Sequence, residues 1–281
     1  MIRIFDWLSK NKWAGFPLAI AYFLLLILPH EQVGIWVVDL FKNKTRAYYQ
    51  HTVLLVGLIL LVLLLYFLVR RIKSHPFRMR LIIGLVVTGL LMVLSFNLLI
   101  IHNIEIIHFL QYFTLSFFIY PLFKNLNRTF FWSTLAGVFD EAYQYLILAP
   151  QRTDYFDFND IVLNEIGAGL GVLFLFALGF YSVHRHQATW YKSPEILVSL
   201  VITITLAGLA LAGEFTYSLP QQGEPPLFAL IKKVEPGFFT EIKHLNARFH
   251  VMRPYEGVVV VVLIGLFYFK LLNPVDHQAD E

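Results

Sequence analysis

The feature that most constrains the fold of this chain is a series of apolar segments, each close to the length that a helix needs to cross a membrane. The segments cover residues 14–29, 52–69, 81–101, 104–123, 130–148, 161–181, 195–213 and 255–272. A membrane-spanning helix needs about 20 mostly apolar residues. Lipid offers no partners to free backbone polar groups, so segments that span it must be helical. The sequence therefore predicts an all-α fold, a polytopic bundle of about eight transmembrane helices.

The composition agrees with a protein embedded in a membrane. Hydrophobic residues make up 58% of the 281 positions and charged residues only 15%, whereas a soluble domain has about 25% charged residues. The chain has no cysteine, which excludes disulfides, thiolate metal sites and cysteine nucleophiles. The net charge of +3 is small, so we expect no nucleic-acid partner.

Basic residues predict the orientation of the bundle. The segment 70–80 contains five basic residues and no acid, and three more precede the first apolar segment. Basic loops stay on the cytoplasmic side of membranes. We therefore expect a multi-pass protein with both termini in the cytoplasm.

The chain divides into three parts. A pair of helices within 1–80 precedes a four-helix core at 81–181, and a second pair follows in 182–281 with a long outer segment at 214–254. Within that segment, apolar residues recur at helical spacing over Phe238–Phe249, which predicts an amphipathic helix at the outer interface. Such a helix has two interpretations, a lid over a polar site or an ordinary connector.

Two adjacent acids interrupt the fifth apolar segment. Asp140 and Glu141 precede its end at Leu148 by about eight residues. At ~1.5 Å per residue this is roughly 12 Å, near the middle of a ~30 Å hydrocarbon core. A carboxylate there costs roughly 3 kcal/mol, so an acid within a membrane is by default a hypothesis for a functional site.

Other polar residues surround these acids in the predicted topology, and three groups would meet at the outer mouth of the bundle. They are Glu105, His108 and Tyr112; then Asp140, Glu141 and Gln144; then Arg152, Asp157, Asp160 and Asn164. Spacings of three and four place the first group on one helix face, and they do the same for Asp157, Asp160 and Asn164. The second group covers an arc of about 100° on its helix, and Arg152 lies in the loop before the third. Gly167 and Gly171 continue the last group and predict a close approach of a neighbouring helix.

This combination of residues is suited to acid–base chemistry beside an anion. Glu141 or Asp140 would act as general acid or base, with His108 as its proton partner. Arg152 offers a planar fork for a phosphate or carboxylate. The other members of the three groups would line the substrate-binding surface.

Structural roles explain several of the same residues. Asp157 could be the N-cap of the sixth helix, with Asp160 in its first turn. His108 could be a hydrogen-bonded structural histidine, and Gln144 and Asn164 could link helices.

A divalent cation is a further interpretation. The oxygen- and nitrogen-bearing candidates are Glu105, His108, Glu141, Asp157 and Asp160. No compact metal-binding motif such as HExxH occurs. The sequence therefore assigns no metal ligand, and the cofactor stays unknown.

The ordered set of motifs resembles the VanZ-like family of bacterial membrane proteins. It contains an acid before His-Phe with a tyrosine four residues after the histidine, then Asp-Glu-x-x-Gln, then Pro and Arg, then Asp-x-x-Asp-x-x-x-Asn-x-x-Gly-x-x-x-Gly. In this chain they are Glu105, His108, Phe109 and Tyr112; Asp140, Glu141 and Gln144; Pro150 and Arg152; and Asp157, Asp160, Asn164, Gly167 and Gly171. The resemblance covers about residues 81–181.

The resemblance implies a role in the bacterial cell envelope, at the outer face of the cytoplasmic membrane. The founding member of the family is associated with resistance to the glycopeptide antibiotic teicoplanin. The expected partners are membrane lipids and a lipid-linked cell-wall precursor or another anionic envelope molecule. The resemblance supplies no reaction, so whether the protein is an enzyme stays open. A proton-coupled transporter or flippase and a membrane scaffold are the alternatives.

Overall fold

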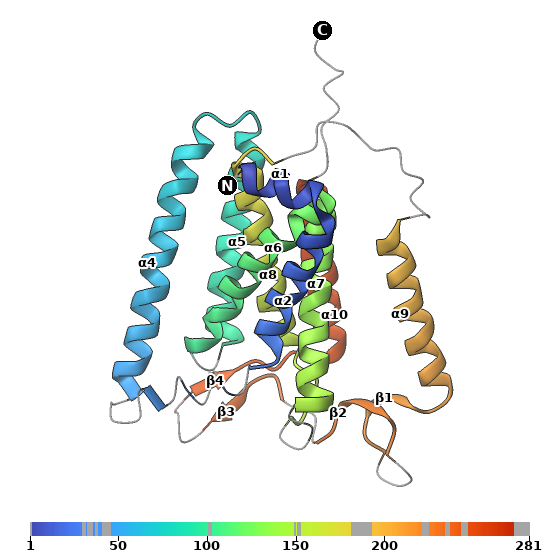
Figure 1. Ribbon diagram of the computed structural model, residues 1–281. Coiled ribbons are helices and arrows are strands. Elements are labelled where there is room, and N and C mark those ends of the chain that lie inside the picture. The colour runs from blue at the N-terminus through green and yellow to red at the C-terminus, as the bar shows by residue number, and fades with distance from the viewer. Residues whose placement is uncertain are drawn as a thin grey trace.

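The computed structural model of the protein describes residues 2–29, 46–100, 103–148, 153–180, 193–220, 225–233, 237–242 and 247–272, with the single positions 32, 36, 39, 40 and 150. These residues are mostly helical (Figure 1). The main helices are α1 (Ile2–Lys10), α2 (Lys12–Ile27), α4 (Arg46–Ile72), α5 (Arg78–Leu98), α6 (Ile107–Phe123), α7 (Leu126–Tyr143), α8 (Phe158–Ala177), α9 (Pro194–Leu211) and α10 (Pro254–Leu271). Each of the predicted apolar segments therefore contains a helix.

Six helical segments of the described chain are long and apolar enough to cross a membrane, namely α4, α5, α6 with the preceding turn, α8, α9 and α10. α2 is apolar but shorter. α7 has 18 residues, but it carries Arg128, Asp140 and Glu141 and so falls outside this set. The prediction of a mostly helical protein with several helices able to span a membrane is confirmed, whereas the number of eight spans stays a prediction.

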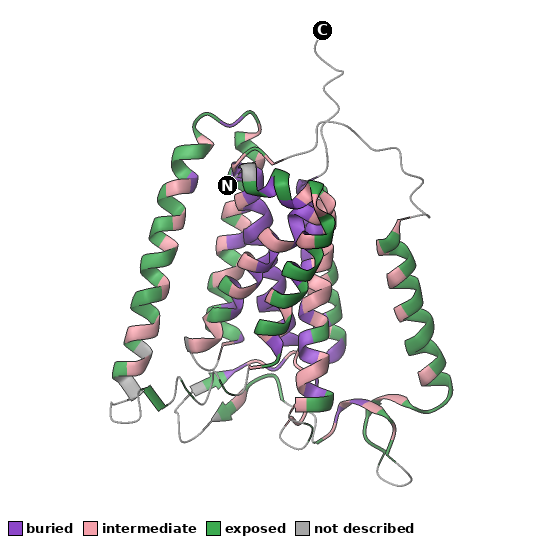
Figure 2. Ribbon diagram, viewed as in Figure 1, coloured by how far each residue is buried: buried purple, intermediate pink, exposed green. Residues whose placement is uncertain are grey.

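α8 forms the centre of the bundle. It packs against α4, α5, α6, α7 and α10, and nearly all of its residues are buried (Figure 2). The glycine prediction is confirmed. A Cβ on Gly167 would lie 2.7 Å from the Phe109 carbonyl oxygen, and one on Gly171 would lie 2.7 Å from that of Phe113. The backbones of α6 and α8 thus approach closely because these positions have no side chain.

The outer helices present apolar side chains away from the protein. α9 has no buried residue, and α4 exposes a long row of leucine, isoleucine and valine side chains (Figure 2). Such a surface suits lipid, which is as apolar as these side chains. α9 is held to α7 by Glu195, which accepts hydrogen bonds from Arg128 Nε at 2.6 Å and from Trp132 Nε1 at 2.9 Å.

The two ends of the bundle differ. α1, the turn between α4 and α5 and the last residues of α10 lie at one end, and the strands lie at the other (Figure 1). The first end carries the basic residues of segment 70–80. The beginnings of α6 and α8 and the end of α7 lie at the second end, where the acids meet.

The prediction of a helix over Phe238–Phe249 is wrong for the residues that the structure describes. β3 (Thr240–Ile242) and β4 (Ala247–Phe249) form an antiparallel pair instead, while residues 243–246 lie outside the described part. The backbone that follows is fixed by tertiary hydrogen bonds, because Asn159 donates to the His250 carbonyl and accepts from Met252 N. Apolar residues at helical spacing can also occur in an extended chain, so this spacing alone does not determine the local structure.

A second small sheet corrects the all-α prediction further. β1 (Phe215–Ser218) and β2 (Phe228–Ile231) pair in parallel. Both sheets belong to the outer segment 214–254, so the fold is a helical bundle with a small β-containing cap at one end.

Candidate functional site

Three helices bring the predicted site residues together at the end of the bundle that carries the strands. α6 begins there with His108 and Tyr112, α7 ends there with Asp140 and Glu141, and α8 begins there. Because α8 is the central helix, its first two turns are enclosed by the other two. Residues more than 50 positions apart in the chain thereby become neighbours.

His108 is held by α8 through both ring nitrogens. Its Nδ1 lies 2.8 Å from Asn164 Oδ1, and its Nε2 lies 3.6 Å from Asp160 Oδ2. The His108 side chain is only 4% exposed. The interpretation of a hydrogen-bonded histidine is correct, and the same contacts place its ring beside an acid.

Asp140 and Glu141 both turn into the protein. Tyr112 donates to Asp140 Oδ2 at 3.0 Å, and the Gln144 side-chain amide reaches Asp140 Oδ1 at 3.2 Å and Glu141 Oε1 at 3.3 Å. Gln144 begins a π-helical turn, η2 (Gln144–Leu148), and this amide ties the two acids together. The tyrosine joins α6 to α7, so part of this network fixes helix packing.

Asp157 is the N-cap of α8, as the structural interpretation expected. Its carboxylate accepts from Asn159 N at 2.9 Å and from Asp160 N at 3.3 Å. Asp157 precedes the helix, and burial together with the neighbouring charge of Asp160 raises the pKa of its carboxyl to about 7. The cap is therefore also a titratable group of the site.

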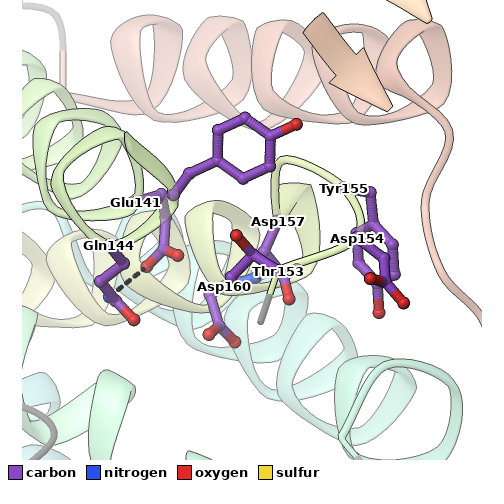
Figure 3. Close-up of a pocket in the computed structure, with 8 residues that line it drawn as sticks. Glu141, Gln144, Thr153, Asp154, Tyr155, Asp157 and Asp160 are labelled. Carbon is purple, nitrogen blue, oxygen red and sulfur yellow. Dashed lines mark hydrogen bonds between the residues drawn. The ribbon is translucent and has the colours of Figure 1, made fainter. Parts of the chain in front are cut away.

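Glu141 and Asp157 line a pocket of about 240 Å³ (Figure 3). Its wall consists of Glu141, Gln144, Tyr145, Thr153, Asp154, Tyr155, Asp157 and Asp160. Glu141 from α7 and Asp160 from α8 lie on one side with Asp157, while Asp154 and Tyr155 lie at the far end (Figure 3).

Segment 214–254 holds the loop that lines this pocket through its β2 strand. Phe156 N donates to the Leu230 carbonyl at 2.8 Å, and Lys232 N donates to the Asp154 carbonyl at 2.7 Å. The Tyr145 hydroxyl donates to the Ala229 carbonyl. The strand thus holds the loop that lines the pocket. The lid interpretation concerned residues 238–249 and stays a prediction.

The predicted site residues fall into three classes. Glu141, Gln144, Asp157 and Asp160 line the pocket, and His108, Tyr112, Asp140 and Asn164 form the buried layer behind it. Glu105 lies in the turn η1 (Asn103–Ile106) before α6 and does not line the pocket. Arg152 lies outside the described residues.

The acids also lie near the start of α8. Glu141 lies beside Asp160, and Asp160 is only two residues from the start of α8 at Phe158. At ~1.5 Å per residue, Glu141 and Asp160 therefore lie within about one turn of that helix end, because α7 and η2 extend past the start of α8. The expected depth of roughly 12 Å was counted from Leu148 and stays a prediction.

Sequence reasoning missed one further buried acid. Glu165 is 1% exposed, and its Oε2 has no hydrogen-bond partner among the described residues. A Cβ on Gly265 would lie 3.5 Å from Glu165 Oε1, so this carboxyl faces α10 and not the pocket. The signal that could have revealed it is an acid within the otherwise apolar run of α8.

Comparisons of the chain with protein families, with curated proteins and with solved structures found no match.

Proposed function

We propose that the protein is a VanZ-like integral membrane protein of the bacterial cell envelope with eight transmembrane helices and cytoplasmic termini. α2 and α7 supplement the six more apolar helices in this proposal. The basic segment 70–80 supports a cytoplasmic position for its end of the bundle. The pocket then opens at the outer face, where envelope molecules are available.

The proposed activity is binding of a lipid-linked or anionic envelope molecule in this pocket. The proposed binding rests on one observation: buried acids and His108 form a layer behind a pocket of about 240 Å³. Buried charges without a packing requirement are costly, so a cluster of them beside an opening favours a site. Arg152, in the loop that precedes α8, would supply a cation for the anionic group.

Proton transfer is the chemistry that the pocket supports best. Glu141 reaches the pocket, and His108 lies behind Asp160 at 3.6 Å. Glu141 would exchange a proton with the bound molecule, and His108 and Asp160 would hold or return it. In this scheme Tyr112 and Gln144 position the acids and do not touch the substrate.

The test compares cells that carry only Glu141→Gln with cells that carry the matched control Glu165→Gln, which alters a buried acid away from the pocket. Envelope lipids and cell-wall precursors are measured by mass spectrometry, teicoplanin susceptibility is scored, and the purified variants are melted. For Glu141→Gln we expect changed envelope molecules and near-normal stability. For Glu165→Gln we expect unchanged envelope molecules. A large loss of stability without a chemical change would instead identify the cluster as structural and refute the proposal.

Proton-coupled transport is a second candidate, because polar side chains continue from the site into the bundle. The Ser116 hydroxyl donates to the Tyr112 carbonyl at 3.0 Å and lies 3.2 Å from the Ser133 hydroxyl. Proton uptake by vesicles containing the purified protein would support transport. Vesicles that stay proton-tight under every imposed gradient would exclude this candidate.

A further inference from the structure

We infer that His108, Glu141 and Asp160 bind a divalent transition-metal ion of the Zn²⁺ or Mn²⁺ class. One ligand atom from each of these residues lies within 4.8 Å of the others. The inference deepens the proposed function, because the ion would form part of the same pocket and, when bound, would take the place of the proton that Glu141, His108 and Asp160 exchange in the metal-free site. Its primary test uses no envelope molecule, so the two proposals can fail separately.

The protonation state of the His108 ring supports a metal ion at this site. An amide oxygen accepts hydrogen bonds and cannot donate them. The 2.8 Å contact with Asn164 Oδ1 therefore places a proton on His108 Nδ1. In the neutral ring Nε2 then carries a lone pair, and this lone pair faces Asp160 Oδ2. Two electron-rich atoms that face each other need either a proton or a cation between them.

The distance between His108 Nε2 and Asp160 Oδ2 also supports a metal ion. They are 3.6 Å apart, whereas a charge-assisted hydrogen bond between nitrogen and oxygen is about 2.7–2.9 Å long. Two ligands bound at about 2.1 Å to a tetrahedral ion are about 3.4 Å apart. The spacing of His108 and Asp160 is therefore closer to that of metal ligands than to that of a shared proton.

The position of Asn164 beside His108 also supports a metal ion. A histidine that binds a metal almost always donates its other N–H to an oxygen, which fixes the ring, and Asn164 provides that oxygen. Asn164 is fully buried, and its Nδ2 makes no hydrogen bond of full geometry in the described chain, although its side chain lies close enough to Glu141 to interact with that carboxyl. An amide so placed can donate to a ligand atom bound to the ion.

The charge of the pocket also favours a cation. Asp154, Asp157 and Asp160 line it together with Glu141. Within the described residues, the ion pairs of these acids are those of Asp160 with His108 and of Asp154 with Lys233. An anionic molecule would be repelled by the remaining carboxylates. A divalent ion would offset part of their charge and, where the proposed function holds, would bind the anionic group directly.

The ligand set selects the class of ion. One imidazole nitrogen with two carboxylates suits Zn²⁺, Mn²⁺ or Fe²⁺, whereas Mg²⁺ and Ca²⁺ prefer oxygen alone. Three protein ligands leave at least one coordination position open, as catalytic sites do. Because Glu141 and Asp160 line the pocket, that position would face the pocket.

The test measures metal binding by the full-length protein in detergent, after any affinity tag is cleaved and bound metal is removed with a chelator. Zn²⁺ and Mn²⁺ are titrated separately, bound metal per chain is counted by equilibrium dialysis with elemental analysis, and melting is followed in parallel. We expect one ion per chain and a higher melting temperature, since a ligand that binds only the folded state stabilises it. His108→Ala and Asp160→Asn should abolish this binding.

Asn164→Ala is the more diagnostic variant, because it retains all three ligands. Loss of the group that orients a metal-binding histidine typically weakens affinity about 10- to 100-fold, so we expect weaker binding at unchanged stoichiometry. The matched controls are Glu165→Gln and His75→Gln, since both ring nitrogens of His75 contact the backbone at Phe77 and Phe176. Both controls should bind as the wild type does.

Two results would overturn the inference. One is a wild-type protein that binds neither ion saturably, which would mean that His108 and Asp160 share a proton. The other is binding that survives in His108→Ala and Asp160→Asn, which would locate the ion elsewhere. In either case, altered envelope molecules in Glu141→Gln cells would leave the proposed function intact.

Discussion

Replacing Gly167 with alanine tests whether close contact between α6 and α8 holds the site together. The added Cβ would lie 2.7 Å from the Phe109 carbonyl oxygen, 2.9 Å from Phe109 Cα and 3.0 Å from the His108 carbonyl oxygen. All three are backbone atoms, so no side-chain rotation can relieve the contact. Ordinary van der Waals contact begins at 3.4 Å, so the helices must separate by 3.4 − 2.7 = 0.7 Å at this point.

The expected loss of stability in Gly167→Ala follows from two opposing effects. Overpacking a well-packed interior costs about 1–3 kcal/mol, and the upper half of that range applies because both helix backbones must move. Alanine in place of glycine within a helix stabilises by about 0.5–1 kcal/mol. Gly89→Ala is the matched control, because no atom lies within 4 Å of its added Cβ and only the second effect operates.

We therefore expect Gly167→Ala to be less stable than Gly89→Ala by about 2–3 kcal/mol, or roughly 5–10 °C in melting temperature at about 2–4 °C per kcal/mol. Intrinsic fluorescence of the five tryptophans reports melting in detergent, and dyes that react with thiols are unsuitable because the chain has no cysteine. Equal melting temperatures for the two alanine variants would refute the close packing of α6 on α8. The shift should also move the His108 backbone, so Gly167→Ala should weaken any metal binding.

Three further predictions concern other buried polar contacts. Tyr112→Phe removes the 3.0 Å hydrogen bond to Asp140 and leaves a buried carboxyl with less support, so thermal melting should show a loss of about 1–3 kcal/mol. Glu165→Met removes an acid whose Oε2 has no partner in the described chain, so the melting temperature should rise, and a fall would show that this carboxyl has a partner. Arg128→Ala breaks the 2.6 Å contact with Glu195, so spin labels on cysteines introduced into α7 and α9 should report a broader distance distribution, whereas an unchanged one would locate the anchor of α9 elsewhere.

Much of the helical architecture was accessible from the sequence for one physical reason. A backbone in lipid must satisfy its own hydrogen bonds, so each apolar run of the right length becomes a helix. Periodicity also placed Asp157, Asp160, Asn164 and the glycines on one face of α8, since residues three and four apart share a helix face. The cap at Asp157 and the contact of α8 with a neighbouring backbone followed from those local rules.

The site could be assembled from the sequence only in part. The spacing within one helix showed that His108 and Tyr112 share a face, but it could not show that the ring of His108 meets Asn164 and Asp160, 56 and 52 positions away. It also could not decide whether Asp140 or Glu141 turns inward. Both do, because Tyr112 holds one acid and the pocket accepts the other.

The sequence by itself determined where helices form and which helix faces carry polar groups, because both depend on neighbours within a few residues. Only the tertiary structure decided how close the acids lie to the start of α8, the strands of segment 214–254, the position of Glu165 against α10 and the attachment of the pocket loop to β2. Each of these depends on how segments distant in the chain align. α7 extends past the start of α8, and Asn159 fixes an extended backbone near residue 250. Such long-range contacts leave no periodic signal in the local sequence.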